Sequence, residues 1–261
     1  MTDDGGRQGV GEATAVFGVD IGGSGIKGAP VDVERGALAE ERYKVLTPQP
    51  ASPESVVDAV REVVRHFDHR GPVGLTFPGV VVGGHTRTAA NVDKGWIGQD
   101  AAGLFQDALG LPAVVLNDAD AAGIAEMAHG AGKGRSGVVL VLTFGTGIGS
   151  ALFTDGALVP NTELGHLELR GKDAERRASS AARERHDLTW PEWAVRVDEY
   201  LDLVDRLFSP QLIVIGGGVS RKHDKFLPLL KEREAEVVPA MLRNDAGIVG
   251  AAMAAGAAAV R

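Results

Sequence analysis

The stretch that decides the fold is AVFGVDIGGSGIKGAP, residues 15–30, in which an apolar run passes directly into a glycine-rich loop. The run AVFGVD (15–20) predicts a buried strand, because it is short, apolar and bounded by glycines, and a hairpin continuation should follow. A second loop, TFGTGIG (143–149), follows a similar apolar run. Either loop alone could be an ordinary glycine-rich turn, but the pair predicts two related α/β units that face each other.

The segments between and after these loops continue the α/β pattern. Residues 53–67 have apolar side chains at helical spacing, with Ser52 as N-cap and Pro53 at the first helical position. Short strands are predicted in PVGLTFPG (72–79), AVVLN (113–117) and QLIVIG (211–216), and the alanine-rich segment 247–260 predicts a closely packed helix. We expect a flexible tail over residues 1–14, a small domain over 15–115, a large domain over 116–246 and a C-terminal helix (247–261) that packs back on the small domain.

Composition narrows the class of protein. A chain of 261 residues with 44% hydrophobic residues can bury substantial cores, and its formal net charge of -8 argues against a nucleic-acid-binding protein, which needs a basic surface. The absence of cysteine excludes disulfides and thiolate metal sites. No apolar run is long enough to span a membrane, and the polar, acidic N-terminus lacks the apolar core of a signal peptide. These features predict a cytoplasmic protein with no membrane partner.

Polar side chains lie at the predicted strand ends, where open α/β sheets bind ligands. Asp20 could hold magnesium through water, although taken alone it is more simply a capping carboxylate, and Lys27 adds a positive charge nearby. In the corner LNDADAAG, we expect Asp120 to cap the following helix and Asp118 to accept a hydroxyl proton. Asn117 beside them can donate to and accept from sugar hydroxyls.

The glycine loops match neither the P-loop spacing nor G-x-G-x-x-G. They offer backbone N–H groups and the hydroxyls of Ser24, Thr143 and Thr146, which suit phosphate oxygens. A further polar set, Glu163, His166 and Glu175, could be a metal site or a polyol site, and its spacing alone does not choose between them.

Taken together, the motifs resemble those of the ROK-family sugar kinases of the actin-like ATPase superfamily. The matching elements, in chain order, are DIGGSGIK (20–27), FPG (77–79), NDADA (117–121), TFGTGIG (143–149), ELGH (163–166) and IGGGV (215–219). Within that family the stretch ELGHLELRGKDAERRAS most resembles the actinobacterial polyphosphate glucokinases. Most ROK members follow the E-x-G-H element with a cysteine-rich zinc site, but KDAE here contains no cysteine, so no zinc is expected.

The resemblance implies a fold, an activity and a set of site residues. The fold would be α/β, with two actin-like ATPase (ribonuclease H-like) domains and a cleft between them, and the activity would be phosphoryl transfer to glucose from polyphosphate or ATP, with magnesium as cofactor. The expected catalytic base is Asp118, and the residues expected to bind glucose are Gly79, Asn91, Asn117, Glu163, His166 and Glu175. The residues expected to bind phosphates, magnesium or adenine are Asp20, Gly22, Gly23, Ser24, Gly25, Lys27, Thr143, Gly145, Thr146, Gly147, Gly216 and Gly217.

A basic run, RGKDAERRASSAARERH (170–186), directly follows the predicted sugar-binding loop. Such a run is commonly a solvated helix face, but a long polyanionic donor would need neutralising charge there. Lys172, Arg176 and Arg177 are therefore the candidates for polyphosphate binding.

Two other functions remain open at this point. One is a strictly ATP-dependent kinase of another hexose. The other is a non-catalytic, sugar-responsive regulator, although such family members carry a helix-turn-helix segment before the first glycine loop, and only about fifteen residues precede it here. A homodimer is also expected from the resemblance.

Overall fold

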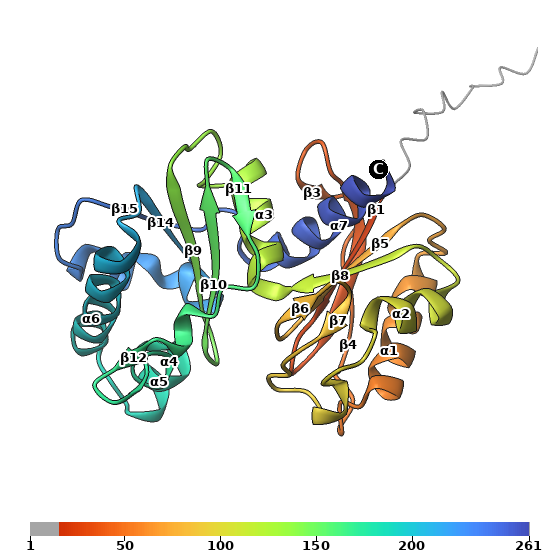
Figure 1. Cartoon of the computed structure of the whole chain (residues 1–261), viewed down its shortest axis with the longest axis horizontal. Helices are drawn as coiled ribbons and strands as arrows, with labels where there is room; N and C mark the ends of the chain where they lie inside the picture. Colours follow the sequence, from red (N-terminus) through yellow and green to blue (C-terminus); the bar gives the residue numbers. More distant parts are fainter. Residues whose placement is uncertain (1–15, 261) are drawn as a thin grey trace, which may run out of the picture.

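The structure, a computed structural model, describes residues 16–260. Two β-sheets flank a central pair of helices, α3 (Asp118–His129) and α7 (Ala246–Ala259) (Figure 1). The tail expected over residues 1–14 lies outside the described residues. None of the helices within the described part of the chain is both long enough and apolar enough to cross a membrane.

The first sheet has the strand order β3-β2-β1-β5-β8, with β4 also paired to β2. β1 and β2 form an antiparallel hairpin, while β5 and β8 continue the sheet in parallel. The strands are β1 (Val16–Ile21), β2 (Ile26–Asp32), β3 (Ala37–Leu38), β4 (Tyr43–Val45), β5 (Val73–Phe77) and β8 (Ala113–Asn117). The domain boundary expected after residue 115 falls inside β8, which continues for two more residues.

The second sheet repeats this arrangement with the order β11-β10-β9-β14-β15. Its β9 and β10 form an antiparallel hairpin, and β14 and β15 follow in parallel. The strands are β9 (Val138–Phe144), β10 (Ile148–Thr154), β11 (Ala157–Val159), β14 (Leu212–Gly216) and β15 (Glu236–Pro239). Both glycine loops predicted from the sequence therefore connect the two strands of equivalent hairpins.

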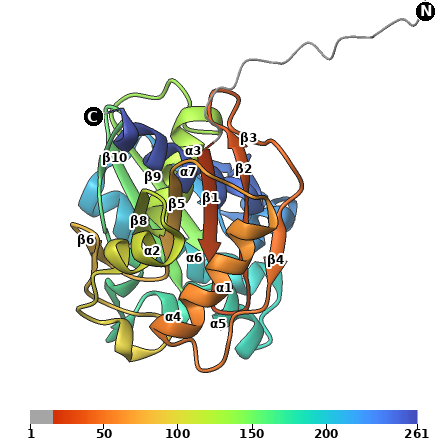
Figure 2. The same ribbon diagram turned by 90° about the vertical axis from the view of Figure 1, so that its right-hand side faces the viewer.

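Helices cover both faces of the first sheet (Figure 2). α1 (Pro53–His66) and α2 (Ala101–Leu109) cover one face, and α7 covers the other. The amphipathic pattern of α1 explains its place, because its buried valines lie at helical spacing against the sheet. Ser52 caps this helix as predicted, with its side chain accepting from the backbone N–H of Ser55.

The second sheet is covered by α6 (Trp190–Phe208) on one face and by α3 on the other. α3 also packs against α7, so these two helices join the sheets. Missing side chains permit this contact: a Cβ on Gly250 of α7 would lie 1.7 Å from the carbonyl oxygen of Ala121 in α3. Gly18 and Gly74 likewise leave room for the backbone of α7 above β1 and β5.

Small elements surround the strand ends. They are the hairpins β6 (Val81–Val82) with β7 (His85–Thr86) and β12 (Glu168–Leu169) with β13 (Lys172–Asp173), the short helices α4 (Glu175–Ala178) and α5 (Ser180–Arg185), and the 3-10 helices η1 (Lys94–Trp96), η2 (Leu164–His166), η3 (Gly218–Lys225), η4 (Leu227–Leu229) and η5 (Arg243–Asp245).

Candidate active site

A cleft with a volume of about 850 Å³ opens where the two hairpin loops face each other. This volume is in the range of small-molecule sites. Most of the residues singled out in the sequence line it: Asp20, Gly22, Gly23, Lys27, Gly79, Asn91, Asn117, Asp118, Thr143, Gly145, Thr146, Gly147, Glu163, His166, Glu175 and Gly217.

Three of the expected phosphate-binding residues do not line the cleft. Gly25 is buried against Lys44 of β4, with its carbonyl oxygen accepting from the N–H of Gly22, and Ser24 of the same loop is exposed without lining the cleft. Gly216 is the buried last residue of β14 and is paired with Thr143 of the neighbouring strand β9. The following residue, Gly217, does line the cleft and has a φ of 78°, and the carbonyl oxygen of Phe144 leaves no space for a Cβ there.

Asp20 is fixed by two partners at the end of β1. Its Oδ1 accepts a hydrogen bond of 2.8 Å from Thr76 Oγ1, and its Oδ2 pairs with Lys27 Nζ at 2.9 Å. Thr76 in turn accepts from the N–H of Ile21. No helix begins at Asp20, so the reading of this carboxylate as a helix cap is wrong. Sequence reasoning also missed Thr76, whose only signal was a hydroxyl in the middle of the apolar strand VGLTF.

Asn117 rather than Asp120 caps α3. Asn117 Oδ1 accepts from the N–H groups of Ala119 and Asp120 at 2.8 and 3.1 Å, and its Nδ2 donates to the carbonyl of Gly79. The prediction that Asp120 caps the helix was wrong, because the cap position lies at the end of the strand and the chain turns into the helix one residue later. The side chain of Asn117 thus joins α3 to the FPG turn.

Asp118 is the first residue of α3 and faces the cleft. Asp118 is exposed to water at the N-terminus of α3. The protein around it nevertheless removes much of the solvent that would stabilise a charged carboxylate. This desolvation raises the pKa of Asp118 to about 7, with additional raising contributions from the negative charges of Asp20 and Glu163. A carboxyl group with such a pKa can take up and release a proton near neutral pH.

Asp120 has a positioning role instead of capping. Its Oδ2 accepts from the N–H of Asn161 at 2.7 Å, and burial raises the pKa of this carboxyl to about 6. The side chain of Asn161 then makes two hydrogen bonds of 2.9 Å with the backbone of Val81. The segment that carries Glu163 is thereby tied both to α3 and to the first half of the chain.

The polar set from the ELGH element and α4 converges on one wall of the cleft. His166 Nε2 lies 3.7 Å from Glu163 Oε2, and Glu175 Oε2 accepts from the N–H of Ile148 at 3.2 Å. Burial raises the pKa of Glu163, opposed by His166 and reinforced by Glu175. The Glu175 carboxylate lies directly against Gly147, where a Cβ would be 2.2 Å from it. The second glycine loop and the polar wall therefore fit directly against each other.

Two residues of this wall and one residue beside it come close enough together to suggest a metal site. One ligand atom each from His166, Asp173 and Glu175 lies within 4.8 Å of the other two. Asp173 was not among the site residues expected from the sequence.

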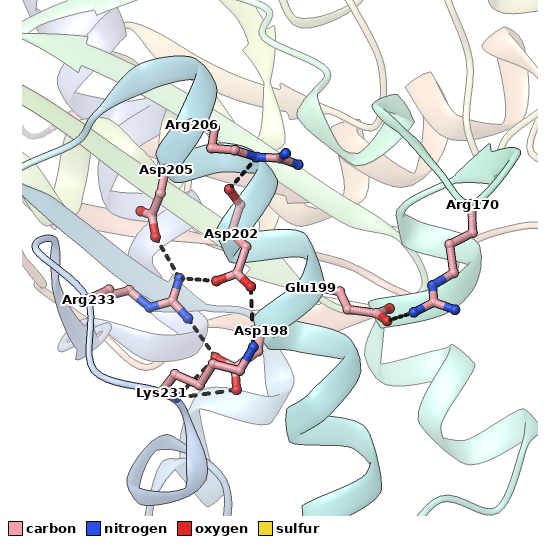
Figure 3. A network of polar contacts seen from close by, with 8 residues as sticks. All are labelled: Arg170, Asp198, Glu199, Asp202, Asp205, Arg206, Lys231 and Arg233. Atoms are coloured by element: carbon pink, nitrogen blue, oxygen red, sulfur yellow. Dashed lines mark hydrogen bonds and ion pairs between the residues drawn. The ribbon is translucent and has the colours of Figure 1, made fainter.

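The basic side chains of the run 170–186 do not line the cleft, although Glu175 within the run does, and part of their charge is already paired. Arg170 and Arg177 both pair with Glu199 of α6, which lowers the pKa of Glu199 (Figure 3 shows the Arg170 contact). Arg176 Nε lies 3.8 Å from Asp173 Oδ2. Lys172 is exposed, and no ion pair or hydrogen bond of its side chain is found within residues 16–260.

A separate ionic network on the far part of α6 fixes the chain before β15. Arg233 is 6% exposed and donates to Asp198 at 2.6 Å and to Asp205 at 2.7 Å (Figure 3). Separating a buried ion pair would leave each charge without compensation. The network therefore anchors the segment before β15 to α6. None of its residues lines the cleft.

Known proteins similar to this chain include sugar kinases. The polyphosphate glucokinase of Mycobacterium tuberculosis strain H37Rv is 56% identical over 239 residues, which cover 91% of this chain and 90% of that protein. An inorganic polyphosphate/ATP-glucomannokinase from Arthrobacter sp. strain KM superposes with a TM-score of 0.90 at 52% identity, covering 94% of this chain and 99% of that one.

A ROK-family glucokinase from Streptomyces griseus, solved with glucose and AMPPNP, gives a TM-score of 0.81 at 27% identity over 93% of this chain and 99% of that one. These matches confirm the expected actin-like α/β fold. The family model described as "ROK family" matches residues 16–183. By this match and by relatives more than half identical over nine-tenths of its length, the chain belongs to the ROK family.

Proposed function

We propose that the protein is a glucokinase that transfers a phosphoryl group from inorganic polyphosphate or ATP to the 6-hydroxyl of glucose, with Asp118 as the base. The observation that carries the proposal is the position of Asp118 in the cleft, beside the polar wall and facing Asp20 of the first hairpin, with a pKa of about 7. A base with this pKa can remove the hydroxyl proton at neutral pH as the oxygen attacks the donor phosphorus.

The sugar would lie against the wall formed by the second half of the chain. Glu163, His166 and Glu175 offer carboxylate and imidazole groups that can accept or donate hydrogen bonds to hydroxyls. Asn117 uses most of its amide on the backbone, and one N–H remains for a hydroxyl. Gly79 and Asn91 line the same space. Holding the sugar in one orientation supplies the positioning that phosphoryl transfer requires.

The donor would lie along the two hairpin loops. Gly22, Gly23, Gly145 and Gly147 expose backbone at the cleft, Thr143 and Thr146 add hydroxyls, and Lys27 adds a positive charge. The negative charge of Asp20 already raises the pKa of Asp118, so this part of the cleft favours a cation, and Asp20 would hold Mg²⁺ through water. When bound, Mg²⁺ would neutralise charge on the transferred phosphate.

The names of the relatives support both the acceptor and the donors. The Mycobacterium relatives are polyphosphate glucokinases, and the Arthrobacter protein is an inorganic polyphosphate/ATP-glucomannokinase. A strictly ATP-dependent kinase of another hexose is the alternative enzyme, and a sugar-binding regulator is the alternative outside catalysis. We further propose that the enzyme acts in the cytoplasm. We also propose that it is a homodimer, which light scattering of the purified protein would test.

Initial rates test the proposal directly. Formation of the sugar phosphate should be measured with ATP and with polyphosphates of several chain lengths, using glucose, mannose and N-acetylated hexoses in turn as acceptors. We expect turnover of glucose with polyphosphate. Turnover with ATP alone would support the ATP-dependent alternative, and sugar binding without product from any donor would identify a regulator.

A further inference from the structure

We propose that Asp173 is a positioning residue that fixes the imidazole of His166 for sugar binding. The inference rests on the proposed function and adds a residue to it. His166 Nδ1 lies 3.4 Å from Asp173 Oδ2, a long hydrogen bond of the kind that tightens when a ligand is bound. The other ring nitrogen, Nε2, lies 3.7 Å from Glu163. His166 thus lies between two carboxylates, one near each ring nitrogen.

The two carboxylates approach different nitrogens of the ring, and only Glu163 lines the cleft. Glu163, His166 and Glu175 line the cleft, whereas Asp173 does not. Asp173 ends the hairpin strand β13, paired with Glu168 of β12, and its carboxylate also lies near that of Glu175, within 4.8 Å. Nδ1 of His166 is therefore directed to Asp173, and Nε2 is directed to Glu163, which lines the ligand space.

This arrangement selects one tautomer of the neutral ring. An ionised Asp173 can only accept, so it favours the tautomer in which Nδ1 carries the hydrogen. Nε2 then keeps a lone pair facing the cleft. The distance of 3.7 Å from Nε2 to Glu163 is too long for a hydrogen bond, which leaves both atoms as acceptors for two neighbouring sugar hydroxyls.

Arg176 adds a further contact to Asp173. Its Nε lies 3.8 Å from the same Asp173 oxygen that faces His166. The Arg176 guanidinium therefore lies next to the carboxylate that contacts His166. Arg176, expected from the sequence to bind polyphosphate, therefore also acts on the sugar side through Asp173.

The half-exposed state of the pair sets the expected size of the effect. The side chain of His166 is 56% exposed and that of Asp173 is 41% exposed in the open cleft. A bound sugar would displace water from the His166 side and strengthen the bond behind it. Removing the bond should weaken sugar binding by the ordinary value of one hydrogen bond, a factor of about 3 to 10.

Steady-state kinetics with ATP test the role. Asp173→Ala should raise the Michaelis constant for glucose by about 3- to 10-fold and change kcat by less than about twofold, since Asp118 is untouched. Asp173→Asn should recover most of the loss, because an amide oxygen still accepts from Nδ1. The matched control is Glu168→Gln, which removes the exposed carboxylate opposite Asp173 in the same hairpin and should leave both constants unchanged.

A spectroscopic readout separates positioning from a general structural effect. In ¹⁵N-labelled protein at a pH where the ring is neutral, the imidazole nitrogens of His166, assigned by their loss in His166→Gln, should show protonated Nδ1 and unprotonated Nε2. Asp173→Ala should shift this population toward the other tautomer, while Glu168→Gln should not. Thermal melting of each variant verifies that it is folded.

Three results would overturn the inference. The first is an unchanged tautomer in Asp173→Ala, and the second is an unchanged glucose Michaelis constant in the folded variant. The third is a stoichiometric metal ion in washed wild-type protein that is lost in Asp173→Ala, which would make His166, Asp173 and Glu175 ligands. If the wild-type enzyme does not phosphorylate glucose at all, the proposed function fails, and the tautomer measurement still judges Asp173.

Discussion

Asp20 lies close enough to Asp118 for its negative charge to raise the pKa of the Asp118 carboxyl. The two residues are far apart in the sequence, but Asp20 lies in β1 and Asp118 directly follows β8, and these parallel strands belong to one sheet. The carboxyl ends of parallel strands meet at one edge of a sheet, which is where open α/β folds bind ligands. The donor side and the acceptor side of the cleft are therefore electrostatically coupled.

This coupling predicts the pH dependence of the reaction. Because the base must be ionised to accept a proton, kcat/KM should rise with pH through an apparent pKa of about 7 and level off above it. Asp20→Asn removes a negative charge, so the same limb should move to lower pH even though overall turnover falls. Rates measured from pH 5.5 to 9 with saturating Mg²⁺ give both curves. A flat profile between pH 6 and 8 would argue against this assignment.

The second prediction concerns metal content. We expect washed protein to contain no stoichiometric zinc, because the chain has no cysteine where most family members carry a cysteine-rich zinc site. EDTA should abolish activity by removing Mg²⁺, and Mg²⁺ alone should restore it in full. Elemental analysis provides the check, and one zinc per chain that depends on His166 would require the polar wall to be reassigned.

The third prediction concerns the donor. Replacing Lys172, Arg176 and Arg177 by Ala should raise the Michaelis constant for long polyphosphate about fivefold or more, and that for ATP much less, because a long chain contacts more of the surface. The effect should weaken as salt rises.

Lys172→Ala alone is the cleanest test of that surface, since Arg177 pairs with Glu199 and Arg176 lies beside Asp173. Arg206→Ala, on α6 outside the basic run, is the matched control for a lost positive charge. The glucose Michaelis constant with ATP shows whether the sugar wall is disturbed. Equal losses with both donors, or none with either, would make the run a solvated face.

The fourth prediction tests the contact between the central helices. Gly250→Ala should destabilise the protein by about 3 kcal/mol, because the new Cβ would lie 1.7 Å from the backbone oxygen of Ala121. Gly256→Ala in the same helix is the control: its Cβ would meet Val16 at an ordinary 3.4 Å, so it should stabilise by about 0.5–1 kcal/mol. Urea unfolding measures both. Equal effects would mean that α3 and α7 do not pack as closely as described.

The sequence was most informative where local pattern determines structure. The strands before both glycine loops, the helix after Ser52 and the alanine-rich C-terminal helix all occur where periodicity and turn residues predicted them. Most of the residues named from the family motifs line one cleft, because these motifs fall at the strand ends and loops that face it.

Contacts between distant segments could not be predicted in the same way. Asn117 and Asp120 are both good capping residues, and only the position where the strand ends decides that Asn117 caps. The pairing of Arg177 with Glu199 depends on how α4 packs on α6, which local spacing does not contain. In the sequence, Asp173 is one acidic residue within a basic run. Its contact with His166 depends on the fold of the hairpin β12–β13, which local spacing does not determine.

Asp118→Asn tests the central claim most directly. The amide keeps the shape of the side chain and removes its capacity as a base, so kcat should fall by about 100-fold or more with both donors. Glucose affinity, measured by calorimetry, should stay within about threefold of the parent value, and the melting temperature should not fall, since the substitution removes a charge that is poorly solvated. Turnover close to that of the parent enzyme, in a folded variant that binds glucose, would remove Asp118 from the mechanism and contradict the account.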